Sequence, residues 1–116
     1  MRWIYNPGMV RNYNGQYSYN RDTITNWNSD SIGVYYCGYI LPNGNLSPFY
    51  IGRAVGQGGI RARLLEHLLD DSWPDVTHFG YCICDTVSEA ENLESQEILN
   101  FNPKYNTQGT WQTYLK

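Results

Sequence analysis

Three stretches of the chain have the pattern of β-strands. Residues 32–40, IGVYYCGYI, are β-branched and aromatic almost throughout, which is typical of a strand. The turn-rich segment LPNGNLSP follows, and the apolar pattern resumes in FYIGRA at 49–54, so these two strands are predicted to form a hairpin with a long connection. Residues 77–85, THFGYCICD, are the third predicted strand.

Two further stretches repeat their apolar residues with helical spacing. In residues 59–71 the apolar side chains fall on one broad face, and Pro74 ends the helix because the residue before a proline avoids helical backbone. Residues 88–101, SEAENLESQEILNF, form the second predicted helix, and Ser88 with Glu91 fits an S-x-x-E capping box. The predicted order is strand, strand, helix, strand, helix.

Residues 1–30 differ from the rest because aromatic residues alternate with asparagines, without a helical period or a repeat. The aromatic members are Trp3, Tyr5, Tyr13, Tyr17, Tyr19 and Trp27. We predict an N-terminal arm over 1–30 that precedes a domain over 31–116. Two interpretations of the arm stay open: its rings pack on the domain, or its rings and arginines contact a nucleic acid.

The charge of the chain limits what it can bind. The 116 residues carry a net charge of −3, and residues 31–116 hold five basic and nine acidic side chains. A general nucleic-acid binder needs a broad basic surface, so a polyanion would be bound here only at a small local site. Residues 49–65, with three arginines and no carboxylate, are the one candidate of useful size.

The cysteine count and the lengths of the apolar stretches indicate the cellular compartment in which the protein is expected. The odd count of three cysteines, Cys37, Cys82 and Cys84, argues against a disulfide framework and favours buried thiols. No stretch approaches the roughly 18 apolar residues of a membrane span, and MRWIYNPG lacks the apolar core of a signal peptide. We therefore expect a soluble, intracellular, cytoplasmic protein.

Several charged residues lie on or beside the apolar faces of the two predicted helices. Arg63 and His67 are four residues apart, so they share a face at the margin of the core. Arg61 projects near the centre of the apolar face, where it would have to extend around the start of the helix. Glu94 and Glu97 fall inside the apolar face of the second helix. A carboxylate there should be paired, protonated or metal-bound, unless both acids lie at the core margin.

At this point the chain resembles the GIY-YIG nucleases. GVY at 33–35 and YIG at 50–52 are similar to the paired signature of that family, with Val34 in place of the usual isoleucine. Arg53 stands where the family often has lysine or serine, and Gly59 where it often has asparagine.

Further positions keep the spacing of the family. The helix pattern L-x-x-R-x-x-x-H is matched by Ile60, Arg63 and His67. Glu94 precedes Pro103 by nine residues and Asn106 by twelve, as in the closing E-x₈-P-x-x-N. The resemblance covers roughly residues 32–107 in the right order throughout.

The resemblance implies an α+β fold with a three-stranded antiparallel sheet flanked by helices, in the order β-β-α-β-α. It also implies metal-dependent hydrolysis of phosphodiester bonds in duplex or branched DNA. Glu94 would bind one Mg²⁺ or Mn²⁺, and Arg63 would hold a non-bridging phosphate oxygen. Arg53, Arg61 and Lys104 are further candidates for contacts with the substrate.

The remaining roles also follow from the resemblance. Tyr35 would be the general base, oriented or relieved of its proton by His67, and Tyr50 would stand beside the metal-bound waters. Asn106 would fix the site through hydrogen bonds. A free tyrosine has a pKa of about 10, so forming the phenolate at pH 7 costs roughly 4 kcal/mol, which nearby cations would have to offset.

Other functions are compatible with the sequence. The chain could be a catalytically weak or inactive module of the same fold that binds nucleic acid or acts as a scaffold. It could also be a nuclease that acts on RNA, or one that depends on a partner protein or a homodimer for target recognition.

Overall fold

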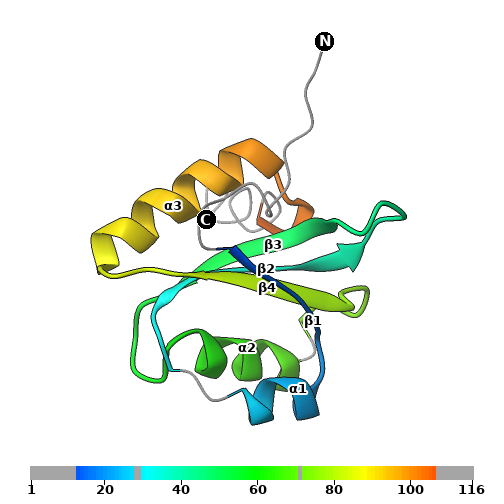
Figure 1. Ribbon diagram of the computed structural model, residues 1–116, viewed down its shortest axis with the longest axis horizontal. Helices are drawn as coiled ribbons and strands as arrows, with labels where there is room; N and C mark the ends of the chain where they lie inside the picture. Colours follow the sequence, from blue (N-terminus) through cyan, green and yellow to red (C-terminus); the bar gives the residue numbers. More distant parts are fainter. Residues whose placement is uncertain (1–12, 28–29, 71, 107–116) are drawn as a thin grey trace, which may run out of the picture.

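The computed structural model describes residues 13–27, 30–70 and 72–106, which form one sheet between two helical layers (Figure 1). Five elements lie where the sequence predicts them: β2 (Gly33–Ile40), β3 (Leu46–Ala54), α2 (Gly59–Leu69), β4 (His78–Ile83) and α3 (Val87–Phe101). Two further elements precede them, β1 (Tyr13–Ser18) and α1 (Arg21–Asn26). The molecule is therefore an α+β domain.

Over the residues that the structure describes, the sheet has four strands in the order β1-β4-β2-β3, with every neighbouring pair antiparallel. The expected three-stranded sheet is wrong, because β1 pairs with β4 and extends the sheet by one strand. Tyr13 lies opposite Cys82, so this pairing joins segments almost 70 residues apart along the chain. No local periodicity predicts such a partner, because strand pairing is decided by tertiary contacts.

The central strand β2 is buried on both faces. Val34 and Tyr36 point toward α3, whereas Tyr35 and Cys37 point toward the layer of α1 and α2. Successive strand residues point to opposite faces, so one uninterrupted apolar run supplies both halves of the core. In Figure 1, α3 covers one face of the sheet, and α1 and α2 lie side by side on the other.

The ends of several elements differ from the sequence prediction. The N-cap of α3 is Thr86 rather than Ser88: its side chain accepts the Glu89 backbone N–H at 3.0 Å, and the Glu89 carboxylate accepts from the Asp85 N–H. T-x-x-E therefore replaces the predicted S-x-x-E motif, two residues earlier. Strand β3 starts three residues before the predicted 49–54, which shortens the hairpin connection.

Residues 13–27 of the predicted arm pack on the rest of the domain. Ile24 of α1 is fully buried, and the Trp27 ring lies 4.5 Å from the ring of Tyr81, centroid to centroid. The ring of Tyr13 meets that of Tyr36 edge to face on the other side of the sheet, at 5.4 Å. The earlier aromatic residues Trp3 and Tyr5 lie outside the described residues.

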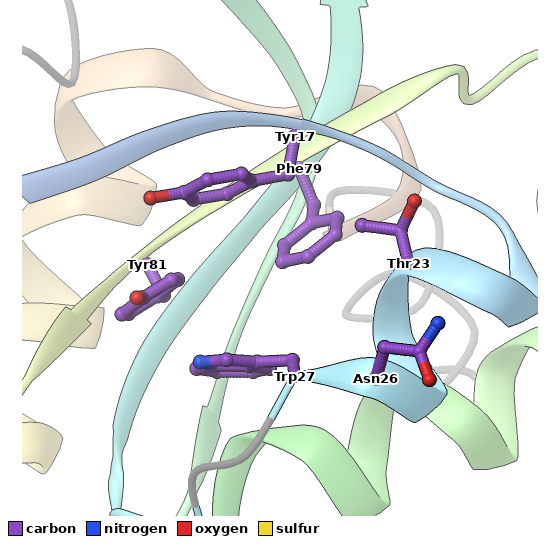
Figure 2. A pocket seen from close by; sticks show the side chains of 6 residues that line it. All are labelled: Tyr17, Thr23, Asn26, Trp27, Phe79 and Tyr81. Carbon is purple, nitrogen blue, oxygen red and sulfur yellow. The ribbon is translucent and has the colours of Figure 1, made fainter.

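A pocket of about 370 Å³ lies between β1, α1 and β4 (Figure 2). Its lining consists of Tyr17, Thr23, Asn26, Trp27, Phe79 and Tyr81. Four of these six side chains are aromatic, and none of them carries a charge at neutral pH. The pocket forms where β1 pairs with β4 and α1 packs on the same side of the sheet as α2.

Two expectations about composition can be compared with the structure. Cys37, Cys82 and Cys84 are buried free thiols, as predicted. Within the part of the chain that the structure describes, no helix is both long and apolar enough to cross a membrane.

Candidate active site

Tyr35 occupies the centre of the candidate site. It is fully buried in β2 and lies directly opposite Gly52 of β3. A Cβ atom built on Gly52 would lie only 2.6 Å from the Tyr35 hydroxyl oxygen, so the absent side chain is what makes room for the phenol. The Tyr35 hydroxyl therefore extends over the edge strand β3, toward α2.

His67 receives this hydroxyl group. The Tyr35 oxygen and His67 Nε2 are 2.9 Å apart, which is within hydrogen-bonding distance. Burial, helped by the Arg63 guanidinium, lowers the pKa of His67 to about 4, although the carboxylates of Glu66 and Asp70 oppose the shift. The imidazole is neutral at pH 7, and with its proton on Nδ1 it accepts the Tyr35 hydroxyl at Nε2.

Arg63 lies one helical turn before His67 and is close to both phenols of the site. Burial raises the pKa of both Tyr35 and Tyr50, and the positive charge of Arg63 opposes this rise at each of them. Its side chain is 43% exposed and forms an ion pair with Glu66 in the next turn of α2. Arg63 can therefore meet an anion that approaches from solvent while it remains next to the buried Tyr35 and the partly buried Tyr50.

An aromatic stack holds Tyr50 and His67 in place. Trp73, in the loop after α2, stacks on Tyr50 at 4.7 Å and lies 4.2 Å from the His67 ring, centroid to centroid. The Tyr35 and Tyr50 rings are 6.1 Å apart. Trp73 is 7% exposed, so it closes this side of the cluster against water.

The pKa values of both tyrosines are raised, contrary to what a phenolate base requires. Burial is the main cause for each, and the Arg63 charge offsets only part of the shift. For Tyr50, the negative charge of Glu94 is the second cause that raises the pKa. A free phenolate at Tyr35 is thus costlier than in water, and any proton transfer there needs an acceptor in direct contact, which His67 provides.

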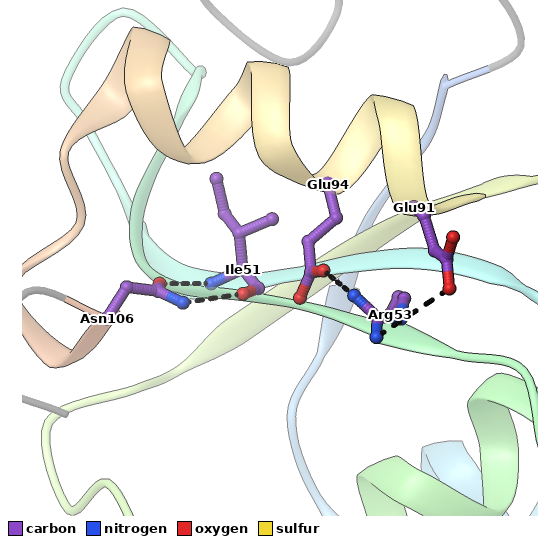
Figure 3. A network of polar contacts seen from close by, with 5 residues as sticks. All are labelled: Ile51, Arg53, Glu91, Glu94 and Asn106. Carbon is purple, nitrogen blue, oxygen red and sulfur yellow. Dashed lines mark hydrogen bonds and ion pairs between the residues drawn. The ribbon is translucent and has the colours of Figure 1, made fainter. Parts of the chain in front are cut away.

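Glu94 reaches from α3 toward Arg53 on the edge strand β3 (Figure 3). Its Oε1 accepts a hydrogen bond from Arg53 Nη1 at 2.7 Å, and the other terminal nitrogen of Arg53 lies 3.9 Å from Glu91. The Glu94 side chain is 16% exposed, while Arg53 and Glu91 are substantially exposed. The Glu94 carboxylate is therefore partly accessible from solvent, and it is already paired with the Arg53 guanidinium.

Asn106 fixes the edge strand that carries Tyr50 and Gly52. Its side chain accepts the Ile51 N–H at 2.7 Å and donates to the Ile51 carbonyl at 2.8 Å (Figure 3). These two hydrogen bonds mimic a neighbouring strand and occupy part of the free edge of β3. The two residues on either side of Ile51 both belong to the candidate site, so Asn106 helps to hold them in register.

The fit of a divalent metal ion depends on Glu94. Among the described residues, no group of three or more His, Cys, Asp or Glu side chains could hold a metal ion. Mg²⁺, however, often binds to one carboxylate and keeps most of its waters until substrate phosphate replaces some of them. The single carboxylate of Glu94 therefore fits a hydrated ion only when Arg53, which now pairs with it, moves away.

The structure brings together most of the residues predicted from the sequence. Tyr35, Tyr50, Arg63 and His67 form one cluster, and Glu94 is close enough to perturb the pKa of Tyr50.

Two predicted substrate-binding residues lie elsewhere. Arg61 Nη2 donates to the Thr25 carbonyl of α1 at 3.3 Å. Lys104 pairs with Asp75 and lies over the ring of Phe49.

Sequence reasoning missed one feature of the site and one of the core beside it. In the sequence, Trp73 stands out only as the residue before Pro74. Its place just after the helix that carries Arg63 and His67 is nevertheless a signal that its ring could pack on that helix. The partner of Glu97 was also missed: this fully buried carboxylate accepts the Tyr36 hydroxyl at 2.7 Å. Glu97 therefore belongs to the core between the sheet and α3, whereas Glu94 belongs to the site.

Comparisons of this chain with models of protein families, with curated proteins and with solved structures find no match.

Proposed function

We propose that this protein is a metal-dependent endonuclease that hydrolyses phosphodiester bonds of DNA at the Tyr35–His67 site. The observation that carries the proposal is the hydrogen bond between a buried tyrosine and a neutral histidine, with Arg63 beside it. Structural cores do contain such pairs. Here, however, a partly exposed arginine on α2 lies beside both tyrosines, and a carboxylate on α3 acts on one of them, Tyr50.

The fold supports a GIY-YIG-like arrangement of these groups. From Gly33 to Phe101 the elements follow as strand, strand, helix, strand, helix, with Tyr35 and Tyr50 on adjacent strands. In this proposal β1 and α1 are additions to the edge of the sheet at β4, on the side away from β3.

The residues of the chain divide the work as follows. Tyr35 takes a proton from the attacking water while its own hydroxyl proton passes to His67 Nε2, so no free phenolate forms in the buried site. Arg63 holds a non-bridging oxygen of the phosphate and stabilises the charge that develops in the transition state. Tyr50 orients water beside Glu94, and Asn106 keeps the edge strand in place.

A divalent ion held by Glu94 would supply charge neutralisation at the phosphate and at the leaving oxygen. For that to happen, Arg53 has to leave the carboxylate. Arg53 is 41% exposed but Glu94 only 16%, so this ion pair is partly buried, and breaking it costs more than the roughly 0–1 kcal/mol of a fully exposed pair. Once released, the Arg53 side chain is free to contact a DNA phosphate.

The same ion pair favours a second candidate function. If Arg53 stays on Glu94, the domain binds nucleic acid but cleaves it weakly or not at all. This alternative predicts weak, salt-sensitive binding, because few basic groups are present to neutralise phosphates.

A nicking assay separates the two functions. Supercoiled plasmid is incubated with Mg²⁺ or Mn²⁺ and wild-type protein, Glu94→Gln or Glu91→Gln, with EDTA as a further control. Both glutamates lie on the same face of α3 and contact Arg53, so Glu91→Gln is a matched change beside the site. We expect nicking that requires metal and Glu94 but not Glu91. Binding without nicking under all of these conditions would establish the second function instead.

A further inference from the structure

The Arg53–Glu94 ion pair joins two side chains that have separate roles in the proposed function. Glu94 is the candidate metal ligand, and Arg53 is a candidate contact for a DNA phosphate. Arg53 Nη1 donates to Glu94 Oε1 at 2.7 Å (Figure 3). A metal ion on the other carboxylate oxygen would lie directly beside this guanidinium, and the two positive charges would repel each other. One ion pair therefore keeps a cation site and an anion site closed at the same time.

The two partners of this ion pair differ in their exposure to water. The Glu94 side chain is 16% exposed, whereas the Arg53 side chain is 41% exposed. Removing the partner of a partly buried carboxylate costs more than breaking a fully exposed pair. At a site with one carboxylate, Mg²⁺ also relies on substrate phosphate for its binding. In the absence of DNA, a divalent ion therefore competes poorly with Arg53 for Glu94.

A DNA phosphate can compensate for the loss of this ion pair. A guanidinium binds phosphate and carboxylate in the same way, through two parallel hydrogen bonds. Because Arg53 is partly exposed, a phosphate can reach it from solvent. The other carboxylate near Arg53, that of Glu91, lies 3.9 Å from Nη2 and is 51% exposed, so a pair with Glu91 alone contributes little. Release of Glu94 is therefore favoured when a phosphate takes the guanidinium.

Arg63 and Lys104 also form ion pairs, but theirs do not involve the metal ligand. Arg63 pairs with Glu66, and Lys104 pairs with Asp75. Neither of these two carboxylates is a candidate metal ligand, so a phosphate that displaces one of them opens no metal site. Among the ion pairs of the described residues, only that of Arg53 links phosphate binding to the release of a metal ligand.

We propose that the Arg53–Glu94 ion pair is a latch that the substrate opens: a DNA phosphate takes Arg53 from Glu94 and thereby frees the carboxylate for the divalent ion. The proposal rests on the proposed nuclease function for the identity of both ligands. Coupling between two ligands is reciprocal, so DNA and the ion strengthen each other's binding by the same factor. The metal site is thus filled mainly when DNA is bound.

The test measures binding rather than cleavage. Every protein carries Tyr35→Phe, which removes the proposed proton-transferring hydroxyl, and a gel confirms that the DNA stays intact; Tyr35→Phe alone is the reference protein. The Kd of a short labelled duplex is measured by fluorescence anisotropy in EDTA and in saturating Mn²⁺ at constant ionic strength. The Kd in EDTA divided by the Kd in Mn²⁺ is the coupling ratio. Adding Glu94→Gln removes the metal ligand, so that ratio reports only the effect of Mn²⁺ as a counterion of DNA.

Arg53→Gln separates the latch from direct contact between the metal ion and DNA. An ion that touches both Glu94 and a phosphate couples the two ligands without any latch, and that contribution remains in Arg53→Gln. We therefore expect the coupling ratio of Arg53→Gln to be about fivefold lower than that of the reference protein, even though Mn²⁺ binds more tightly to the free variant. Lys104→Gln should keep the reference ratio. It is a matched control because it removes the same charge from a side chain that is 47% exposed and paired with Asp75.

Several results would overturn the proposal: equal coupling ratios in the reference protein and Arg53→Gln, an equal loss in Lys104→Gln, or a reference ratio no larger than that of Glu94→Gln. Equal ratios with Arg53→Gln would mean that Arg53 moves to Glu91 or to solvent when the ion binds. The nuclease function is tested separately, by nicking of plasmid with wild-type protein. Metal-dependent nicking with equal ratios would keep the nuclease function and remove the latch, whereas unequal ratios without nicking would keep the latch in a binding module.

Discussion

Gly52 offers the sharpest test of how the candidate site is built. It is the residue that allows the Tyr35 phenol to cross β3, and the Cβ atom that Gly52→Ala introduces would lie 2.6 Å from the Tyr35 hydroxyl oxygen and 2.8 Å from Tyr50 Cε2. Ordinary contact begins near 3.4 Å, so the hydroxyl oxygen has to move by about 0.8 Å. Tyr35 is fully buried, and the movement therefore disturbs its 2.9 Å contact with His67.

The size of the effect follows from these contacts. Overpacking a buried site by one methyl group costs typically 1–3 kcal/mol, so we expect the free energy of unfolding to fall by about that amount. A displacement of about 1 Å at a catalytic group lowers the rate by roughly 100-fold. Gly52→Ala should therefore remain folded at 25 °C but nick plasmid about 100 times more slowly.

The control is the same substitution at Gly56, in the loop between β3 and α2. A Cβ at this position meets nothing within 4 Å, so Gly56→Ala should keep wild-type nicking and gain about 0.4–1 kcal/mol of stability from reduced freedom of the unfolded chain. Urea denaturation of the two variants gives the change in unfolding free energy, and initial nicking rates give the change in activity. Wild-type nicking by a folded Gly52→Ala protein would refute the placement of Tyr35 as the proton-transferring group.

Three further predictions concern single contacts. The pKa of His67 is about 4 in the folded chain against about 6.5 when unfolded, so stability is lost as pH falls from 6.5 toward 4. With a discount for partial exposure, the free energy of unfolding measured in urea should fall by about 1–2 kcal/mol more between pH 7 and 4.5 in wild-type protein than in His67→Gln. An equal fall in both proteins would argue against a buried neutral imidazole. Replacing Glu97 by Leu should lower the free energy of unfolding by about 1–3 kcal/mol, because the buried Tyr36 hydroxyl loses its acceptor. Adding Tyr36→Phe should restore much of that stability, and a further loss of stability in the double variant would contradict the reasoning. Arg53→Gln should tighten Mn²⁺ binding about twofold to fivefold in a calorimetric titration because it frees Glu94, and weaker binding would show that Arg53 does not compete with the ion.

Glu94, which acts on Tyr50, and Glu97, which binds Tyr36, show why nearby acids on one helix have different roles. Glu94 and Glu97 are three residues apart on α3, and the sequence places both inside its apolar face. The structure buries Glu97 completely against Tyr36 and leaves Glu94 accessible beside the edge strand. Helical spacing fixes only the direction of a side chain, and the neighbouring strand decides whether that direction leads to the core or to solvent.

Local periodicity determined five of the seven elements that the described residues form, and the common face of Arg63 and His67, because these features depend on residues two to four positions apart. It could not supply β1, whose partner is nearly 70 residues away, or the stacking of Trp73 on Tyr50 and His67. The ion pair of Arg53 with Glu94 joins a strand to a helix, and the aromatic pocket joins β1 and α1 to β4. These contacts form only when distant segments pack together, so the tertiary structure alone decided them.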